Sequence, residues 1–414
     1  MILVLLAWSP TARSGQKLIT PGQKWDDVVH AAKPGDVIVL MPGEHRPGKI
    51  TDHGGTIDQP IIIRGVDADH PAIIKGARYG LSITRPGHLV FKNIVIEGAE
   101  VNGVLIDAST RSRNKFLVKD PETEAETTKS TEPGSVKLVN VTIRNTGSKK
   151  DKRNAIELYH AQNVTIENCL IESWSDVGVE IIGSSIVTID SCSFMGSSTM
   201  NPTAGIRARA GTTNVNIVNC RFFDCGLTGV CAGGISRFKH FPDEKLEDTK
   251  VASIFEARHV SIEKSLFVGG ASAITLSHCD RVQINRNSIV NPKYYVFCLL
   301  RISHDNFLGD TRRCTFEQNL VTWEPDSMEK FFLIDKGVEL KTIKMEANLW
   351  WSSEPVESWT RLGEIPESGH VAQLFEIDPR LSDQFVPTSL KANGYGAFSI
   401  QIAQPGDEKP PIGQ

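Results

Sequence analysis

Two glutamates and an arginine recur at nearly constant spacing in the middle of the chain. Glu157, Glu180 and Arg207 are 23 and 27 residues apart, and each is the third residue of a short apolar segment. If these segments are strands in successive coils, the three side chains lie on one outer face, about 5 Å apart along the stack. Tyr159 and Arg209 follow two residues later. Carboxylates, guanidiniums and a phenol on one face are groups that bind ions and move protons.

A second outward row and a nearby insertion add further polar groups. The second row contains Tyr159, Ile182 and Arg209, and Asp107 is expected to continue it upstream. The insertion at 236–253 leaves the following coil and mixes basic with aromatic residues, so it is expected to overhang the same face. The insertion contributes three candidates for chemistry, Arg237, Lys239 and His240. His160, directly after Tyr159, is a fourth.

The segments that position these residues belong to an internal repeat. Nine copies share an alternating apolar strand, a polar residue, and a second short apolar strand. The polar position is occupied by Asn93, Asn145, Asn168, Ser191, Asn219, Lys264, Arg286, Gln318 and Ala347. Successive copies are 52, 23, 23, 28, 45, 22, 32 and 29 residues apart. The short spacings fit one coil of a β-helix, and the two longest fit two coils or a coil with an insertion.

The repeat predicts an all-β fold, a single-stranded right-handed parallel β-helix with a short N-terminal capping helix over 20–31. Alternation along each strand buries the apolar side chains, and the residue after the bend is expected to stack inside the solenoid. That interior stack comprises Cys169, Cys192, Cys220, Ser265, Asn287, Asn319 and Asn348. A β-sandwich would require hairpin signals, whereas Asn-Gly occurs only at Asn102 and Asn393.

The chain divides into three parts on this interpretation. Residues 1–15 are a possible signal peptide or a truncated leader, because their apolar run is too short to span a bilayer and lacks a basic start. Residues 16–400 form the β-helix, with inserted loops near 109–134 and 236–253. Residues 401–414 are rich in proline and charge, so we expect a disordered tail.

Composition excludes several classes of protein. Hydrophobic residues make up 40% of the chain and charged residues 23%, which is not the profile of a disordered protein. The net charge of −4 gives no reason to expect nucleic acid or an anionic membrane as a partner. None of the eight cysteines forms a C-x-x-C pair, so a zinc ribbon is not expected. Three share one position of the repeat, which favours buried thiols over disulfides.

Segments near both ends resemble pectate-lyase-like right-handed β-helix proteins. They are Pro-Gly-Asp-Val-Ile-Val-Leu-Met-Pro-Gly at 34–43, Gly-Gly-Thr-Ile-Asp-Gln-Pro-Ile-Ile-Ile-Arg-Gly at 54–65, Ile-Ile-Lys-Gly at 73–76, and a closing segment from 375 to 398. With the coils between them, the resemblance covers nearly the whole chain. Members of that group include pectate lyases, the chondroitinase B and alginate lyase family, mannuronan epimerases and proteins without known activity, so it implies the fold rather than one reaction.

The nearest enzymatic resemblance is to the chondroitinase B and alginate lyase family, which cleaves uronic-acid polymers by β-elimination. Glu-Ile-Ile-Gly-Ser-Ser at 180–185 is similar to its Glu-led strand, and Arg-Ala-Arg-Ala-Gly at 207–211 is similar to its Arg-bearing strand. That family uses a lysine and an arginine on successive coils, often with calcium. Gly183, Ser184 and Ser185 stand where the lysine is expected, so the family's own mechanism lacks one of its groups here.

β-Elimination requires the uronate carboxylate to be neutralised and a base to remove the C5 proton. The resemblance implies calcium at Glu157 and Glu180 and uronate binding by Arg207 or Arg209. The base would then be Tyr159, Lys239 or His240, which completes the candidate site. We therefore predict a monomeric protein, secreted, periplasmic or at the cell surface, that acts on an acidic polysaccharide or oligosaccharide and has no membrane span.

Two other functions stay open. In a non-catalytic carbohydrate-binding or cell-surface solenoid, Arg207 would only offset repulsion between the two glutamates. Trp323, Trp350, Trp351 and Trp359 could stack on sugars there, but packing in the core or at an edge near the C-terminal coils is the favoured interpretation. A glycoside hydrolase would need two carboxylates, but the paired aspartates and Gly-His-Gly signature of β-helix hydrolases are absent. His278 with Asp280, and Arg301 with His304 and Asp305, are interpreted as turn groups.

Overall fold

The computed structural model describes residues 15–67, 69–109, 134–242, 254–302, 308–336, 338, 343–365 and 372–397. The predicted leader lies outside the described residues except for its last position, and so does the predicted tail at 401–414. Most of the predicted loop at 109–134 and residues 243–253 of the second insertion also lie outside them.

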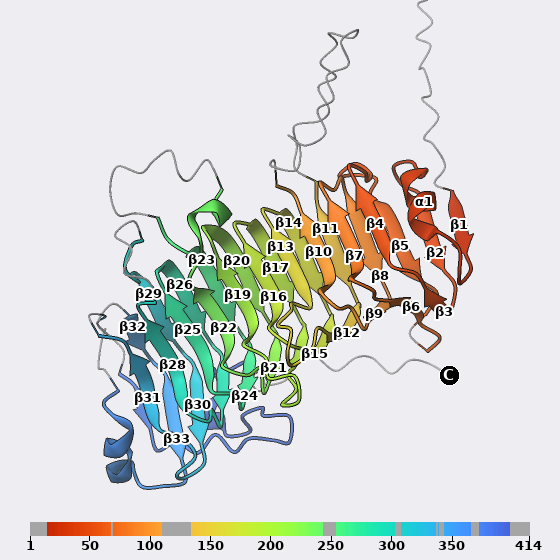
Figure 1. Ribbon diagram of the computed structural model, residues 1–414. Coiled ribbons are helices and arrows are strands. Elements are labelled where there is room, and N and C mark those ends of the chain that lie inside the picture. Colours follow the sequence, from red (N-terminus) through yellow and green to blue (C-terminus); the bar gives the residue numbers. More distant parts are fainter. Residues whose placement is uncertain are drawn as a thin grey trace, which may run out of the picture.

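Three parallel sheets run along the long axis of the molecule, and each coil of chain adds one strand to each sheet (Figure 1). Sheet A consists of β1 (Gln16–Ile19), β2 (Val37–Leu40), β5 (Ile61–Gly65), β8 (Leu89–Lys92), β11 (Val136–Val139), β14 (Gln162–Glu167), β17 (Ser185–Asp190), β20 (Thr212–Val218), β23 (Ala257–Glu263), β26 (Cys279–Asn285), β29 (Cys314–Glu317) and β32 (Ile343–Glu346). Sheet B consists of β3 (Gly43–His45), β6 (Ala72–Lys75), β9 (Ile94–Glu97), β12 (Thr142–Thr146), β15 (Leu170–Trp174), β18 (Ser193–Met195), β21 (Arg221–Phe223), β24 (Leu266–Val268), β27 (Ser288–Val290), β30 (Leu320–Trp323), β33 (Leu349–Ser352) and β34 (Leu374–Phe375). Sheet C consists of β4 (Gly48–Thr51), β7 (Tyr79–Thr84), β10 (Asn102–Asp107), β13 (Ile156–Tyr159), β16 (Val177–Ile182), β19 (Ala204–Arg209), β22 (Thr228–Gly233), β25 (Ser272–Ser277), β28 (Tyr295–Leu300) and β31 (Lys330–Ile334).

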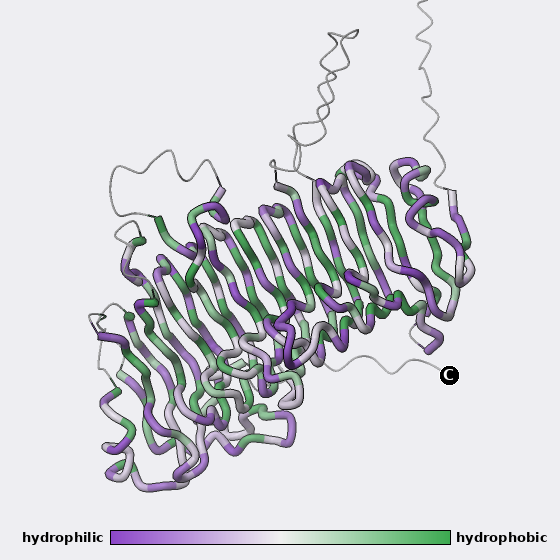
Figure 2. Tube along the Cα trace, viewed as in Figure 1, coloured by the Kyte–Doolittle hydropathy of each residue, from purple (hydrophilic) through white to green (hydrophobic). Residues whose placement is uncertain are grey.

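The predicted right-handed parallel β-helix is confirmed. Apolar and polar residues alternate along the strands (Figure 2), and one apolar core runs through the coils from Ile19 to Leu362. Four short helices complete the regular structure of the described residues: α1 (Trp25–His30) and the 3-10 helices η2 (Phe238–His240), η5 (Val356–Leu362) and η6 (Leu390–Ala392). No helix in that part of the chain has the length and hydropathy to cross a bilayer.

The bend between sheets A and B is made by the repeated polar position. Eight of the nine predicted bend residues lie at this bend, with φ between 49° and 54°. The prediction was wrong for Asn145, which lies within β12 of sheet B; Asn140, with φ of 53°, makes the bend in that coil. Asparagine adopts this left-handed conformation more readily than most residues, which explains why it recurs there. The side chains of Asn140 and Asn168, both at this bend, are exposed. Asparagine is therefore favoured at the bend by its backbone conformation, and its side chain faces solvent. The buried stack begins one residue later.

That buried stack is a chain of hydrogen bonds parallel to the solenoid axis. The backbone amide of Cys169 donates to Sγ of Cys192 at 3.4 Å, and the amide of Cys220 donates to Oγ of Ser265 at 3.1 Å. The next links are Ser265 to Asn287, Asn287 to Asn319, Asn319 to Asn348, and Asn348 to Gln373. All eight cysteines are free and buried, which confirms the predicted thiols.

A helix covers the N-terminal end of the described solenoid, and a returning segment covers one side of its C-terminal half. Helix α1 is shorter than the predicted helix over 20–31, but its Trp25 and Val29 are buried in the core of the first coils. Gly48 is required beneath Trp25, because an added Cβ would lie 2.0 Å from the indole ring. At the other end, residues 381–397 return along the outer face of sheet B, where the amide of Ala397 donates to Ser288.

The favoured prediction for the four C-terminal tryptophans, packing in the core or at an edge, is confirmed. Trp323, Trp350 and Trp359 are buried and pack edge-to-face with phenylalanines or with each other, and Trp351 is half-buried against the returning segment. Burial of these rings stabilises the last coils. It leaves Trp323, Trp350 and Trp359 no exposed ring face for a sugar.

Candidate functional site

The outer face of sheet C carries the predicted rows in register. Strand pairing places Glu157 opposite Glu180, and Glu180 opposite Arg207. In the second row, Tyr159 pairs with Asp107 on one side and Ile182 on the other, and Ile182 pairs with Arg209. The spacing of 23 and 27 residues therefore corresponds to one coil each, and the rows lie on β10, β13, β16 and β19.

Glu180 joins the two arginines of β19. One carboxylate oxygen accepts hydrogen bonds from Nε and Nη2 of Arg207 at 2.8 and 2.6 Å, and the other accepts from Nε of Arg209 at 2.5 Å. The glutamate is fully buried, while the arginine side chains keep 21% and 17% of their surface exposed. Burial acts to lower the pKa of Arg207, but attraction to Glu180 outweighs it and raises that pKa. Glu180 thus holds two guanidiniums at the surface.

Glu157 lies beside this ion pair in a less charged setting. Its Oε2 accepts hydrogen bonds from the side-chain amides of Asn154 at 2.9 Å and Asn102 at 3.3 Å. Burial raises the pKa of Glu157, and the neighbouring Glu180 charge adds to the increase. The neutral form of Glu157 is therefore favoured relative to an exposed glutamate.

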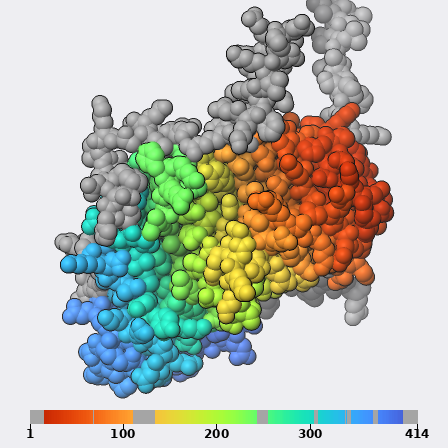
Figure 3. Space-filling model, viewed as in Figure 1, coloured from red at the N-terminus to blue at the C-terminus, as the bar shows by residue number. Residues whose placement is uncertain are grey.

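The described part of the second insertion lies over the same face. Helix η2 brings His240 to Tyr159, with 3.3 Å between the phenol oxygen and Nδ1 of the imidazole. Nε2 of His160 contacts the carbonyl oxygen of His240 at 2.9 Å, and the His160 ring stacks on Tyr159. Phe241 is buried in a small apolar cluster with Ile182, so the segment is anchored. It forms the bright green protrusion of Figure 3.

The surroundings of His240 favour its neutral form over the charged one. Burial lowers its pKa, and the positive charges of Arg209, Lys239 and Arg237 lower it further. Lys239 and Arg237 are themselves exposed on the overhanging segment. A neutral imidazole hydrogen-bonded to a phenol is a proton acceptor within reach of that phenol. In the tautomer with the proton on Nε2, Nδ1 accepts the hydroxyl proton.

Sequence reasoning missed the groups that fix Arg209 and the overhanging segment. Glu256 is fully buried; it accepts hydrogen bonds from the amide of Ala210 at 2.7 Å and from the amide and hydroxyl of Ser236 at 2.8 and 2.6 Å. Nη1 of Arg209 donates to the same hydroxyl at 3.2 Å. Burial raises the pKa of Glu256. Its only sequence signal was a glutamate at the end of an insertion, outside the repeat.

The two glutamates of this arrangement offer few free oxygen ligands for calcium. Ca²⁺ takes six to eight oxygen ligands, whereas both oxygens of Glu180 accept guanidinium bonds and Oε2 of Glu157 accepts two amides. Within the described ranges, no three His, Cys, Asp or Glu side chains gather into a metal-binding group. Calcium at Glu157 and Glu180 stays a prediction, and we derive no catalytic step from it.

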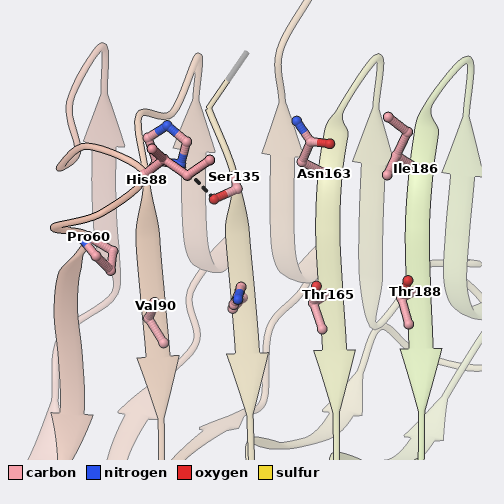
Figure 4. A pocket seen from close by; sticks show the side chains of 10 residues that line it. Pro60, His88, Val90, Ser135, Asn163, Thr165, Ile186 and Thr188 are labelled. Carbon is pink, nitrogen blue, oxygen red and sulfur yellow. Dashed lines mark hydrogen bonds between the residues drawn. The ribbon is translucent and has the colours of Figure 1, made fainter. Parts of the chain in front are cut away.

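A surface groove of about 570 Å³ lies on a different face, along the outer side of sheet A (Figure 4). It is lined by groups such as Lys137, Thr165 and Thr188, and at its edge His88 contacts the hydroxyl of Ser135 at 2.8 Å. Its lining contains no carboxylate to pair with these groups. The glutamates, arginines, tyrosine and histidine that contact one another all lie over sheet C, so sheet C remains the candidate.

Comparison with known proteins agrees with the fold. The family model described as "right handed beta helix region" matches residues 128–319. No curated protein matches the sequence. Solved structures with similar folds include the polysaccharide lyase Pedsa3628 of the PL6 family from Pseudopedobacter saltans, at 12% identity and a TM-score of 0.49 over 93% of this chain and all of that one. Pectate lyase Pel9A has 13% identity and a TM-score of 0.48, with 93% of this chain and 96% of that chain covered.

An alginate lyase from Paenibacillus sp. str. FPU-7 has 12% identity and a TM-score of 0.46, with 79% of this chain and 98% of that chain covered. At these identities the likeness concerns the fold alone. The chemistry of this chain has to be argued from its own residues.

Proposed function

We propose that this protein cleaves an acidic polysaccharide at uronate linkages by β-elimination, on the outer face of sheet C. The observation that carries the proposal is the contact between the Tyr159 hydroxyl and His240, two strands away from Arg209. Two strand spacings separate the backbones of Tyr159 and Arg209 by about 10 Å. A sugar ring held between them would present its carboxylate to the guanidinium and its C5 proton to the phenol.

The residues present account for each proton in the reaction. His240 accepts the hydroxyl proton of Tyr159, and the resulting phenolate removes the C5 proton. The electron pair of that C–H bond forms the C4–C5 double bond as the C4–O4 bond breaks. Tyr159 then donates the proton that it took from C5 to the departing O4, which becomes the hydroxyl of the leaving sugar. No added acid is needed, because one group removes and returns the same proton.

The arginines supply the charge that makes the C5 proton removable. A uronate carboxylate must be neutralised before the carbanion beside it can form. Arg207 and Arg209 are held by Glu180 at the bottom of the site, with their outer edges exposed. Asp176 lies 3.5 Å from Arg207 and offsets part of its charge, while Arg237 and Lys239 add positive charge around His240. The region around Tyr159 and His240 therefore favours an anionic sugar.

Hydrolysis by two carboxylates is less well supported. Such enzymes bring both carboxyl groups to the glycosidic bond. Glu180 has no exposed surface, and its oxygens are occupied by guanidiniums, so it cannot contact a sugar. We also propose that the protein is a monomer and that it is exported to the place where such polymers occur.

Incubation with pectate, alginate and glycosaminoglycans, each with and without calcium, tests the reaction. β-Elimination produces an unsaturated uronate whose ultraviolet absorbance rises with time, and Tyr159→Phe serves as the inactive control. No absorbance change with any polymer would refute the lyase. Shortened products without the double bond would indicate hydrolysis, and binding without products would indicate a non-catalytic solenoid.

A further inference from the structure

A second charged cluster lies on the coils that follow the candidate site. Asp280 is buried at the start of β26, and strand pairing places it between Arg258 of β23 and Arg312. Its carboxylate lies 3.7 Å from Nε of Arg258 and 3.6 Å from Nε of Arg312. Nε of Arg313 donates to it at 2.7 Å, and a second guanidinium nitrogen completes a bidentate pair.

The cluster contains more positive charge than the fold requires. Arginine stays protonated at every physiological pH, so among the described residues three guanidiniums around one carboxylate leave a surplus of two charges. The attraction of these arginines lowers the pKa of Asp280 even though burial opposes it. The bidentate Arg313 alone would satisfy Asp280. Neighbouring like charges on a sheet repel one another, so Arg258 and Arg312 add a cost that an anion would offset.

The surplus guanidiniums are arranged for recognition of an anion. Arg258 and Arg312 both lie over the ring of buried Phe255, at 4.8 and 4.7 Å from its centroid. Stacking of this kind orients the guanidinium plane. The side chains of Arg258, Arg312 and Arg313 keep 38%, 47% and 47% of their surface exposed. Their outer N–H groups therefore face solvent in the fork geometry that carboxylates match.

We infer that Arg258 and Arg312, beside the Arg313–Asp280 pair, bind uronate carboxylates of the polysaccharide, beyond the sugar that is cleaved. This inference rests on the proposed function. Thr213, four residues after Arg209, pairs with Arg258 on the next coil. A chain bound at Arg209 and extended along the solenoid axis therefore runs toward the cluster. Arg281, whose guanidinium lies 2.9 Å from Nε2 of His259 in the adjoining row, adds one more positive charge there.

Affinity electrophoresis and calorimetry with polygalacturonate and alginate test this site. Both are performed in a Tyr159→Phe background so that the polymer stays intact. The test variant, Arg258→Gln with Arg312→Gln, keeps the Arg313–Asp280 pair. The matched control is Arg144→Gln, because Arg144 is 38% exposed but shares its charge with Glu97 on sheet B. We expect the affinity of the double variant for polyuronate to fall by about fivefold to tenfold, and this affinity to depend less on salt than that of its parent. The affinity of Arg144→Gln should equal that of its parent.

The outcomes separate this inference from the proposed reaction. Equal affinity of the double variant and its parent would overturn it, and so would absence of polyuronate binding by the parent. Loss of affinity for dextran sulfate but not for polyuronate would assign the arginines to sulfate esters and would also overturn it. If the active protein forms no unsaturated product yet the double variant loses polyuronate binding, the lyase proposal fails and the anion site stands.

Discussion

The hydroxyl of Tyr159 lies 3.3 Å from Nδ1 of His240, although 81 residues separate the two in the sequence. One group is on a rigid strand of sheet C, and the other is on a segment that leaves the solenoid three strands later in that sheet. Tyr159→Phe removes the proton-transferring oxygen and nothing else. We expect turnover to fall by about a hundredfold or more, measured as the rate of unsaturated product formation.

Tyr295→Phe is the matched control for that change, because the Tyr295 hydroxyl likewise makes a hydrogen bond of 3.3 Å, to exposed Glu329. Both variants should keep the melting temperature of the parent within a few degrees, since one neutral hydrogen bond contributes about 1 kcal/mol. Equal turnover in the two variants would remove Tyr159 from the mechanism.

The pH dependence of turnover should follow His240. Its pKa lies below the ordinary 6.5, so the imidazole remains an acceptor below that pH, and activity falls only as the pH drops through the lowered pKa. Lys239→Gln removes one positive charge that lowers this pKa, and we expect the acidic limb of kcat/KM to move upward. A complete loss of activity in Lys239→Gln would instead identify Lys239 as the base.

Glu256 should make stability depend on pH. Because its pKa is raised above 4.5 in the folded protein, the native state holds the proton more tightly than the unfolded chain. This contribution to stability is fully present below pH 4.5 and is lost as the pH rises through the folded pKa. Glu256→Gln is neutral throughout, so urea unfolding across this range should show a smaller decline with pH. An unchanged decline would mean that Glu157, shifted in the same direction, dominates.

Replacing Glu180 should affect folding as well as turnover. Glu180→Gln leaves two guanidiniums without their buried carboxylate, and breaking a buried pair of this kind costs about 3–5 kcal/mol. We expect a lower midpoint of urea unfolding together with loss of activity. Glu172→Gln is the control, because Glu172 is 32% exposed and 4.0 Å from Arg144. A fully stable Glu180→Gln protein would contradict the anchoring role of the glutamate.

Replacement by glycine should have little effect on stability at one asparagine of the repeat and a large effect at another. Asn168 is exposed at a bend with φ of 51°, a conformation that glycine adopts freely, so Asn168→Gly should change stability by less than about 1 kcal/mol. Asn319 is buried and links Asn287 to Asn348. Asn319→Gly leaves buried partners unpaired at about 1–3 kcal/mol each. Calorimetric melting of the pair measures the contrast, and similar melting temperatures would argue against the amide stack.

The coils and the two outward rows were predictable because strand alternation and coil length are local properties of the sequence. Glu157, Glu180, Arg207 and Arg209 fell into register from spacing alone. The role of Glu180 was not predictable, since its pairing with two arginines depends on side-chain conformations across three coils. Glu256 and Ser236 lie at the two ends of an insertion, where the path of the chain follows no period.

The difference between local and long-range information also applies to the predicted helix span and to the predicted calcium ligands. Trp25 was correctly placed in a capping helix, but the predicted span of 20–31 was too long because residues before Trp25 continue β1 into a turn. The resemblance suggested two glutamates for a metal, and it carried no information about the arginines that occupy one of them. The register of the strands follows from the local sequence pattern. The protonation and pairing of the side chains depend on contacts between neighbouring coils.

The stacked thiols have a consequence for how long the protein lasts. Neighbouring Cys192 and burial raise the pKa of Cys169 well above its ordinary value, so the thiol is unreactive while the coils are closed. Opening the solenoid exposes eight cysteines at once. In an oxidising medium these would form mismatched disulfides faster than a long parallel stack can reassemble. The working lifetime is then set by the rate of the first opening rather than by the folding equilibrium, and each molecule that opens is lost.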